Sequence, residues 1–134
     1  FSRMVMLGTP NSGAQMADLL KNWRPFQLLY GTAGQQLVTD RDGYIQQLPI
    51  PTFEFAIIAG GRGNSDGFNP LIPGDDDGVV TRDCTRLPGA TDSSVVHCIH
   101  SFLPGNRDVM GQTLRFLKTG RLRADGEPQP IPRE

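Results

Sequence analysis

Short apolar runs separated by glycine- and proline-rich turns make up most of the chain. Three of these runs have no helical period and contain β-branched or aromatic residues, which predicts buried strands. They are residues 3–8 (RMVMLG), 52–58 (TFEFAII) and 93–100 (SSVVHCIH). Segments with helical spacing lie between them and after the last. The order strand, helix, strand, helix, strand, helix predicts an α/β fold with three parallel strands covered by helices.

The predicted helices differ in how clearly the pattern marks them. Residues 107–118 carry an apolar stripe that ends before Gly120, and residues 14–23 form an amphipathic stretch that ends before Pro25. Residues 79–87 place apolar side chains on one helical face, and residues 26–50 suit short helices joined by turns. After Gly120, residues 121–134 contain three prolines and few apolar groups, so we expect a disordered tail.

Composition narrows the function only by exclusion. The chain has 134 residues, 37% of them hydrophobic, which suits one domain of ordinary size. Its 13 basic and 14 acidic residues give a net charge of −1. Because no basic stripe with interleaved aromatic residues is present, we expect no nucleic-acid partner. No apolar run is long enough to predict a transmembrane segment.

The two cysteines leave the cellular compartment undetermined. Cys84 and Cys98 are 14 residues apart, which is not a metal-binding spacing. An exported protein could form a disulfide between them, and two buried thiols are the default expectation. Apart from a weak calcium alternative in the aspartate-rich loop, nothing else in the sequence indicates a metal or a cofactor.

Two histidines are the candidates for proton transfer near neutral pH. His97 lies within the third predicted strand, where a packed structural imidazole is the expected role. His100 stands at the exit of that strand, before the loop SFLPGN. Functional side chains of parallel sheets gather outside the carboxyl ends of the strands. His100 is therefore the better candidate for a catalytic base.

A run of aspartates, GDDDGVV at residues 74–80, follows the second predicted strand after a long irregular loop. Asp77 precedes a glycine and two anchoring valines, so it should be the most firmly positioned, with Asp75 and Asp76 expected to be solvated. A carboxylate against one imidazole nitrogen fixes its tautomer and stabilises the imidazolium. This predicts pairing of Asp77 with His100. The alternative is an acidic surface loop, or a weak calcium site with Asp66 and Asn69.

Three segments resemble the lipase-like α/β-hydrolases. VMLGTPNSGAQMADLL (5–20) is similar to the strand and turn that follow their nucleophile elbow, and DDDGVV (75–80) is similar to their acid loop. HCIHSFLPGNRDVMGQTLRFLKTG (97–120) resembles their final strand, catalytic histidine and closing helix. The match runs across residues 3–120, in the family's order. It implies a serine hydrolase that cleaves carboxylic esters through an acyl-enzyme, with Asp77 as triad acid and His100 as base.

The family's nucleophile is missing from these residues. No G-x-S-x-G motif occurs, and Ser12 in PNSGA lacks the strand-to-helix elbow that the family uses. The oxyanion-hole segment is also absent. The resemblance therefore implies that residues 1–120 are the carboxyl-terminal part of an α/β-hydrolase domain, which we expect to be inactive alone. Its first strand would expose an edge, so self-association or pairing with the amino-terminal half is expected.

The resemblance also implies a cap and a substrate class. Residues 20–50 correspond to the cap or lid, where Trp23, Phe26 and Leu29 could line an acyl-binding site together with Phe102 beside the base. Simple core packing is the alternative for the cap residues. Small-molecule and lipid esters, and acyl transfer to another acceptor, all remain open. A non-catalytic hydrolase-like protein and a calcium-binding module are the competing classes.

Overall fold

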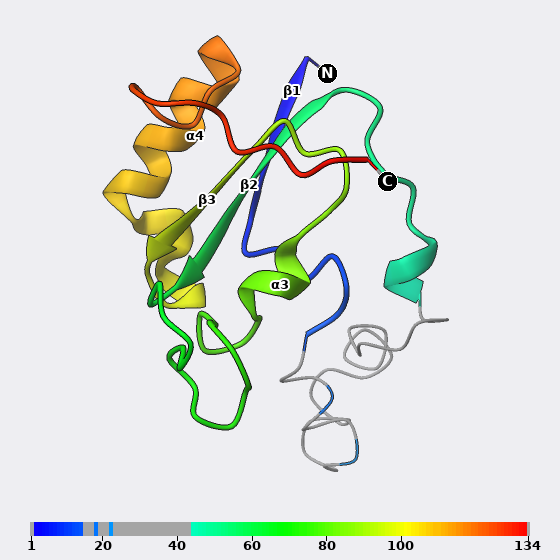
Figure 1. Ribbon diagram of the computed structural model, residues 1–134, viewed down its shortest axis with the longest axis vertical. Helices are drawn as coiled ribbons and strands as arrows, with labels where there is room; N and C mark the ends of the chain where they lie inside the picture. Colours follow the sequence, from blue (N-terminus) through cyan, green and yellow to red (C-terminus); the bar gives the residue numbers. More distant parts are fainter. Residues whose placement is uncertain (1, 15–17, 19–21, 23–43, 134) are drawn as a thin grey trace.

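The computed structural model describes residues 2–14, 18, 22 and 44–133. Its centre is a sheet of three parallel strands in the order β1-β2-β3 (Figure 1). The strands are β1 (Arg3–Leu7), β2 (Glu54–Gly61) and β3 (Asp92–His97). Val5 lies opposite Ala56, and Ala59 lies opposite Val95. The predicted α/β fold with three parallel strands is confirmed.

The central strand β2 is buried on both faces, which is why it reads as a continuous apolar run, whereas β1 is half-buried and β3 alternates between buried and more exposed positions. On one face the sheet packs against helix α4 (Arg107–Thr119), as Figure 1 shows. The buried residues of that layer are Ala56, Ile58, Val96, Cys98, Leu103, Val109, Phe116 and Leu122. On the other face lie Phe55, Ile57, Ala90 and Ile131. The alternation along β2 follows the two-residue period of a strand.

The helices match the prediction unevenly. α4 runs as predicted, with the Asn106 side chain capping its start and Gly120, at φ 78°, ending it. The helix predicted over residues 79–87 is only α3 (Arg82–Thr85), capped by Thr81. It starts late because residues 75–82 pair with one another in a tight antiparallel turn: the N–H of Asp77 donates to the carbonyl oxygen of Val80, and the N–H of Arg82 donates to that of Asp75. Two 3-10 helices complete the described elements, η1 (Tyr44–Gln47) and η2 (His100–Gly105).

β2 extends further than the sequence predicts. The predicted strand ended at Ile58, before Ala59-Gly60-Gly61, yet the strand continues to Gly61. The glycines are needed because other chain segments approach closely. A Cβ on Gly60 would lie 2.7 Å from the Asp77 Cβ, and one on Gly61 would lie 2.8 Å from the Asp75 carboxylate. These glycines therefore serve close packing within the strand rather than ending it.

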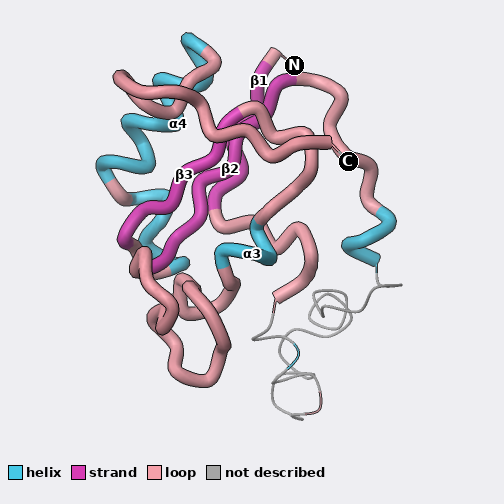
Figure 2. Tube along the Cα trace, viewed as in Figure 1, coloured by secondary structure: helices cyan, strands magenta, loops and turns pink. Residues whose placement is uncertain are grey.

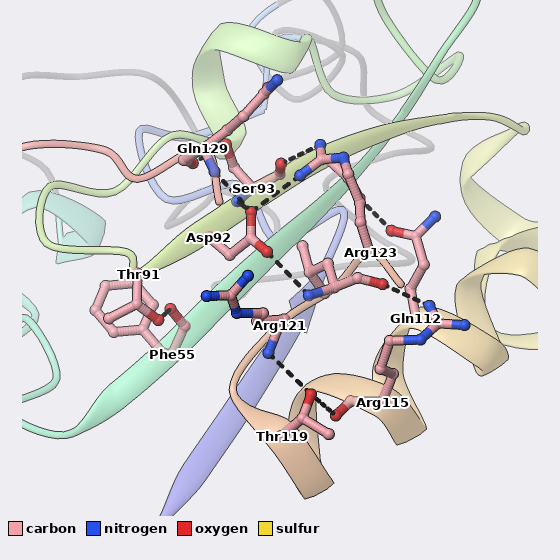
Figure 3. Close-up of polar contacts among 12 residues, drawn as sticks. Phe55, Thr91, Asp92, Ser93, Gln112, Arg115, Thr119, Arg121, Arg123 and Gln129 are labelled. Atoms are coloured by element: carbon pink, nitrogen blue, oxygen red, sulfur yellow. Dashed lines mark hydrogen bonds and ion pairs between the residues drawn. The ribbon is translucent and has the colours of Figure 1, made fainter. Parts of the chain in front are cut away.

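The expected disordered tail is instead ordered chain, which corrects the prediction for residues 121–133. Leu122 and Ile131 are buried, and the backbone of Ile131 pairs with Gly89 and Ala90. The reason is the buried Asp92 carboxylate, which accepts hydrogen bonds from the backbone N–H of Gln129 and from the Arg123 guanidinium (Figure 3). It also accepts from the backbone N–H of Leu122. Composition does not reveal such a polar anchor.

The remaining predictions about organisation have mixed outcomes. Cys84 and Cys98 are both buried, and the structure contains no disulfide between them. Among the described residues, no helix is both long enough and apolar enough to cross a membrane. Most of the predicted helix over residues 14–23 and of the predicted cap over residues 20–50 lies outside the described residues.

Candidate active site

The carboxyl ends of the three parallel strands lie at one edge of the sheet, where the candidate site is built (Figure 2). The loop that leaves β2 brings Asp77 to this edge. β3 ends at His97, and the chain turns through two residues before His100 opens η2. The predicted strand over residues 93–100 is therefore shorter at its end, and His100 belongs to the following turn of 3-10 helix.

The structure brings Asp77 and His100 together. Nδ1 of His100 lies 2.7 Å from Oδ2 of Asp77. The Asp77 side chain is fully buried, whereas the His100 side chain is 33% exposed. The main chain adds a second link, since the N–H of His100 donates to the carbonyl oxygen of Asp77 at 2.9 Å. The two residues are thus fixed to one another through both backbone and side chain.

The remaining oxygen of the Asp77 carboxylate is also occupied. Oδ1 accepts hydrogen bonds from the N–H groups of Val79, at 3.1 Å, and Val80, at 2.8 Å. The valines that follow Asp77 therefore help to aim its carboxylate, as the pattern DGVV suggested. A buried carboxylate needs such donors because desolvation is otherwise costly.

This arrangement sets the protonation of the imidazole. A carboxylate only accepts hydrogen bonds, so Nδ1 of His100 carries the proton and Nε2 of the neutral ring is the basic nitrogen. The hydrogen bond to Asp77 raises the pKa of His100 above its ordinary value, and the Asp77 charge acts in the same direction, while partial burial opposes both. Within the described part of the chain, Nε2 has no hydrogen-bond partner.

Two glycines make room for the Asp77–His100 pair, and the sequence did not connect them with the site. A Cβ on Gly8, at the end of β1, would lie 3.1 Å from Nδ1 of His100 and 3.2 Å from Oδ2 of Asp77. Gly8 also has φ of 57°, where other residues are strained. Gly60 is in similarly close contact with Asp77. A glycine close behind the apolar run of each of two neighbouring strands is the signal that could have identified them.

The prediction that Asp75 and Asp76 are solvated is wrong for Asp76. Asp76 is fully buried, and its carboxylate accepts from the N–H groups of Asn69 and Gly78. Asp75 is half-buried and accepts from the N–H groups of Arg62 and Gly63. Each carboxylate of the run therefore binds a different stretch of backbone. This organisation depends on the path of the loop, which the composition of residues 60–78 does not specify.

The other predicted site residues are placed as follows. His97 is exposed, and its ring stacks on that of Phe68 with centroids 5.3 Å apart, so it is not packed inside the sheet. Phe102 lies two residues after His100 and is 68% exposed. Trp23, Phe26 and Leu29 lie outside the described residues.

The acidic loop does not resemble a calcium site in the part of the chain that the structure describes. Asn69 uses its side-chain amide to donate to the carbonyl oxygen of Gly78, and Asp66 is exposed. No group of three or more His, Cys, Asp or Glu side chains in the described ranges is placed to bind a metal ion.

The chain is similar to a known lipase in structure. No protein-family model matches its sequence, and no curated protein does. The Bacillus licheniformis lipase BlEst2 in its propeptide form superposes with a TM-score of 0.62 and 26% identity, over 98% of this chain and 32% of the lipase chain. The mature form of that lipase superposes with a TM-score of 0.52 and 24% identity, over 77% of this chain and 54% of the lipase chain.

These structures confirm the lipase-like resemblance that the motifs indicated. The strands of the sheet in this chain are all parallel, as expected for an α/β fold. The chain spans about a third of the length of the propeptide form. We conclude that this protein has a lipase-like α/β fold.

Proposed function

We propose that Asp77 and His100 are the acid and the base of a serine-hydrolase triad that cleaves carboxylic esters. The observation that carries this proposal is the 2.7 Å contact between Nδ1 of His100 and the buried Asp77 carboxylate, beside the lipase-like fold. It leaves Nε2 of a partly exposed imidazole available to a third group. The nucleophilic serine would come from a part of the complete protein outside these 134 residues.

The chemistry follows the acyl-enzyme route. Nε2 of His100 takes the proton of the serine hydroxyl as its oxygen attacks the ester carbonyl carbon, and Asp77 stabilises the imidazolium that forms. The imidazolium then gives this proton to the departing alkoxide. Water hydrolyses the acyl-enzyme by the same transfers in reverse order, and the acid and the free serine are released. We propose that Phe102, exposed beside the base, contacts the substrate, together with Trp23, Phe26 and Leu29 of the cap.

We also propose that the preceding part of the complete protein covers one apolar surface. The surface comprises the outer edge of β1 and the exposed side of α4, around a hollow of about 260 Å³ lined by Leu7, Pro104, Val109, Met110, Thr113 and Leu114. Met110 and Leu114 are 43% and 58% exposed. β1 pairs only with β2 among the described strands, so its other edge can accept another strand. The small share of the lipase that this chain spans supports this occupant.

The test is ester hydrolysis by the complete protein with single substitutions in the aspartate run. Asp77→Asn should lower kcat by about 10⁴-fold, the loss found for the equivalent change in a serine-protease triad, because the imidazole tautomer is no longer fixed. Asp75→Asn is the matched control, since its N–H donors are exposed and can bind water instead. A loss below about tenfold for Asp77→Asn would contradict the assignment of the acid.

A further inference from the structure

Asp76 is the most deeply buried acidic side chain of the loop that has no cationic partner. It is 0% exposed, and none of the ion pairs among the described residues includes it. Its Oδ1 accepts from the N–H of Gly78 at 2.6 Å and from the N–H of Asn69 at 3.0 Å. Because an unpaired buried charge is costly, such a carboxylate stays in place only where backbone donors converge on it.

The hydrogen bonds around Asp76 fix the position of Gly78, the residue that follows Asp77. The N–H of Gly78 donates to Asp76, and the carbonyl oxygen of Gly78 accepts from the Asn69 side chain at 3.2 Å. Asn69 is itself fixed by the N–H that it donates to Asp76. Gly78 is thus held at both of its polar groups, directly after the residue that contacts His100.

The space around the Asp76 carboxylate is shaped for it. Gly67 has φ of 60°, and a Cβ at this position would overlap Oδ2 of Asp76. The N–H of Phe68 donates to the carbonyl oxygen of Asp76 at 3.3 Å. The turn at residues 67–69 therefore closes over Asp76 and fits a side chain of its size.

We propose that Asp76 is a positioning residue: its buried carboxylate clamps residues 69 and 78, and thereby orients Asp77 toward His100. Asp76 does not touch His100 or a substrate, so it is not a catalytic residue. The effect of the clamp on catalysis rests on the proposed hydrolase function. The effect on the geometry of the Asp77–His100 pair does not.

The sharpest test displaces the Asp76 carboxylate without removing its charge. Gly67→Ala does this, and Gly63→Ala is the matched control in the same loop, because Gly63 has φ of 76° and a Cβ there meets nothing within 4 Å. Both variants carry the same kind of backbone strain. The pKa of His100 is measured in the complete protein by NMR with labelled histidine, with the signal assigned by its loss in His100→Gln.

Gly67→Ala should lower the pKa of His100 toward its ordinary value of about 6.5, whereas Gly63→Ala should leave it raised. Asp76→Asn should act in the same direction, because a neutral amide accepts the N–H groups of Gly78 and Asn69 more weakly than a carboxylate does, and its NH2 would replace the oxygen that lies 3.3 Å from the N–H of Asn69. If the complete protein hydrolyses esters, Gly67→Ala should also lower kcat by about 10²-fold, the loss that a misplacement of about 1 Å produces.

Either of two results would overturn the proposal. One is a His100 pKa that is unchanged in both Gly67→Ala and Asp76→Asn. The other is loss of the folded state in both variants while Gly63→Ala remains folded, which would make Asp76 a folding residue instead. A lowered pKa without any esterase activity in the parent would reject the proposed function and retain the clamp.

Discussion

His100 meets Asp77 through two separate contacts, one between side chains and one between backbone groups. The sequence predicted this pair from the exit of a strand and from the glycine and valines after Asp77. It did not predict how the neighbouring aspartates act, because their partners are backbone N–H groups brought near by a long irregular loop. Side-chain type and spacing identify an acid and a base, whereas the loop path decides what surrounds them.

The raised pKa of His100 gives the activity a defined pH dependence. Only the neutral imidazole accepts a proton from the nucleophile, so kcat/KM of the complete protein should increase as the pH rises through the pKa of His100. Because Asp77 raises this pKa, the midpoint should lie above about 6.5. In Asp77→Asn the midpoint of the residual activity should be lower. A midpoint that is the same in both proteins would contradict the role of Asp77.

The same shift has a consequence for stability. Since folding raises the pKa of His100, the protonated ring stabilises the folded state. This contribution is complete below about pH 6.5, the ordinary histidine value, and is lost as the pH rises through the raised value. Urea unfolding of the wild type and His100→Gln should therefore differ most at low pH.

At the scale of elements, a prediction held where the residues at the end of an element marked that end in the sequence. α4 was predicted closely because its apolar stripe ends before Gly120, which also ends the helix in the structure. α3 is shorter than predicted because Asp76 and Thr81 form an antiparallel bridge directly ahead of it. Residues 121–133 were expected to be disordered, yet the buried Asp92 anchors them. In the last case, contacts between distant segments overrode the local pattern.

Removal of residues 121–134 should destabilise the protein, although their composition suggests a dispensable tail. The deletion exposes the surface that Leu122 and Ile131 cover, and each fully buried side chain of this size contributes about 1.5–3 kcal/mol. It also leaves Asp92 without Arg123 and two backbone donors. Thermal unfolding should show a clear drop in Tm. Deletion of residues 132–134 alone is the control and should have little effect, and equal Tm values for both deletions would contradict this account.

At the scale of the whole molecule, the sequence predicted the parallel sheet but not which surfaces remain uncovered. Three strands alternating with helical segments were sufficient for the topology. On α4, however, Val109 and Phe116 are buried while Met110, Leu114 and Leu117 are exposed. A single apolar stripe does not show which of its residues face the sheet and which face another part of the protein.

The 134-residue chain alone should self-associate through this apolar surface. Leu114→Lys should shift size-exclusion chromatography toward the monomer, because a charge cannot be buried at such a contact. Leu71→Lys is the matched control, since Leu71 is 72% exposed and lies in the loop after β2. A wild-type chain that elutes as a stable monomer would refute the proposed surface.

The most direct measurement for the central claim is the intact mass of the complete protein before and after reaction with a fluorophosphonate, with the adduct mapped by peptide. We predict one adduct, on a serine outside these 134 residues, that is lost in His100→Ala and retained in His97→Ala. A folded complete protein without an adduct, or an adduct that persists in His100→Ala, would contradict the assignment of Asp77 and His100 to a catalytic triad.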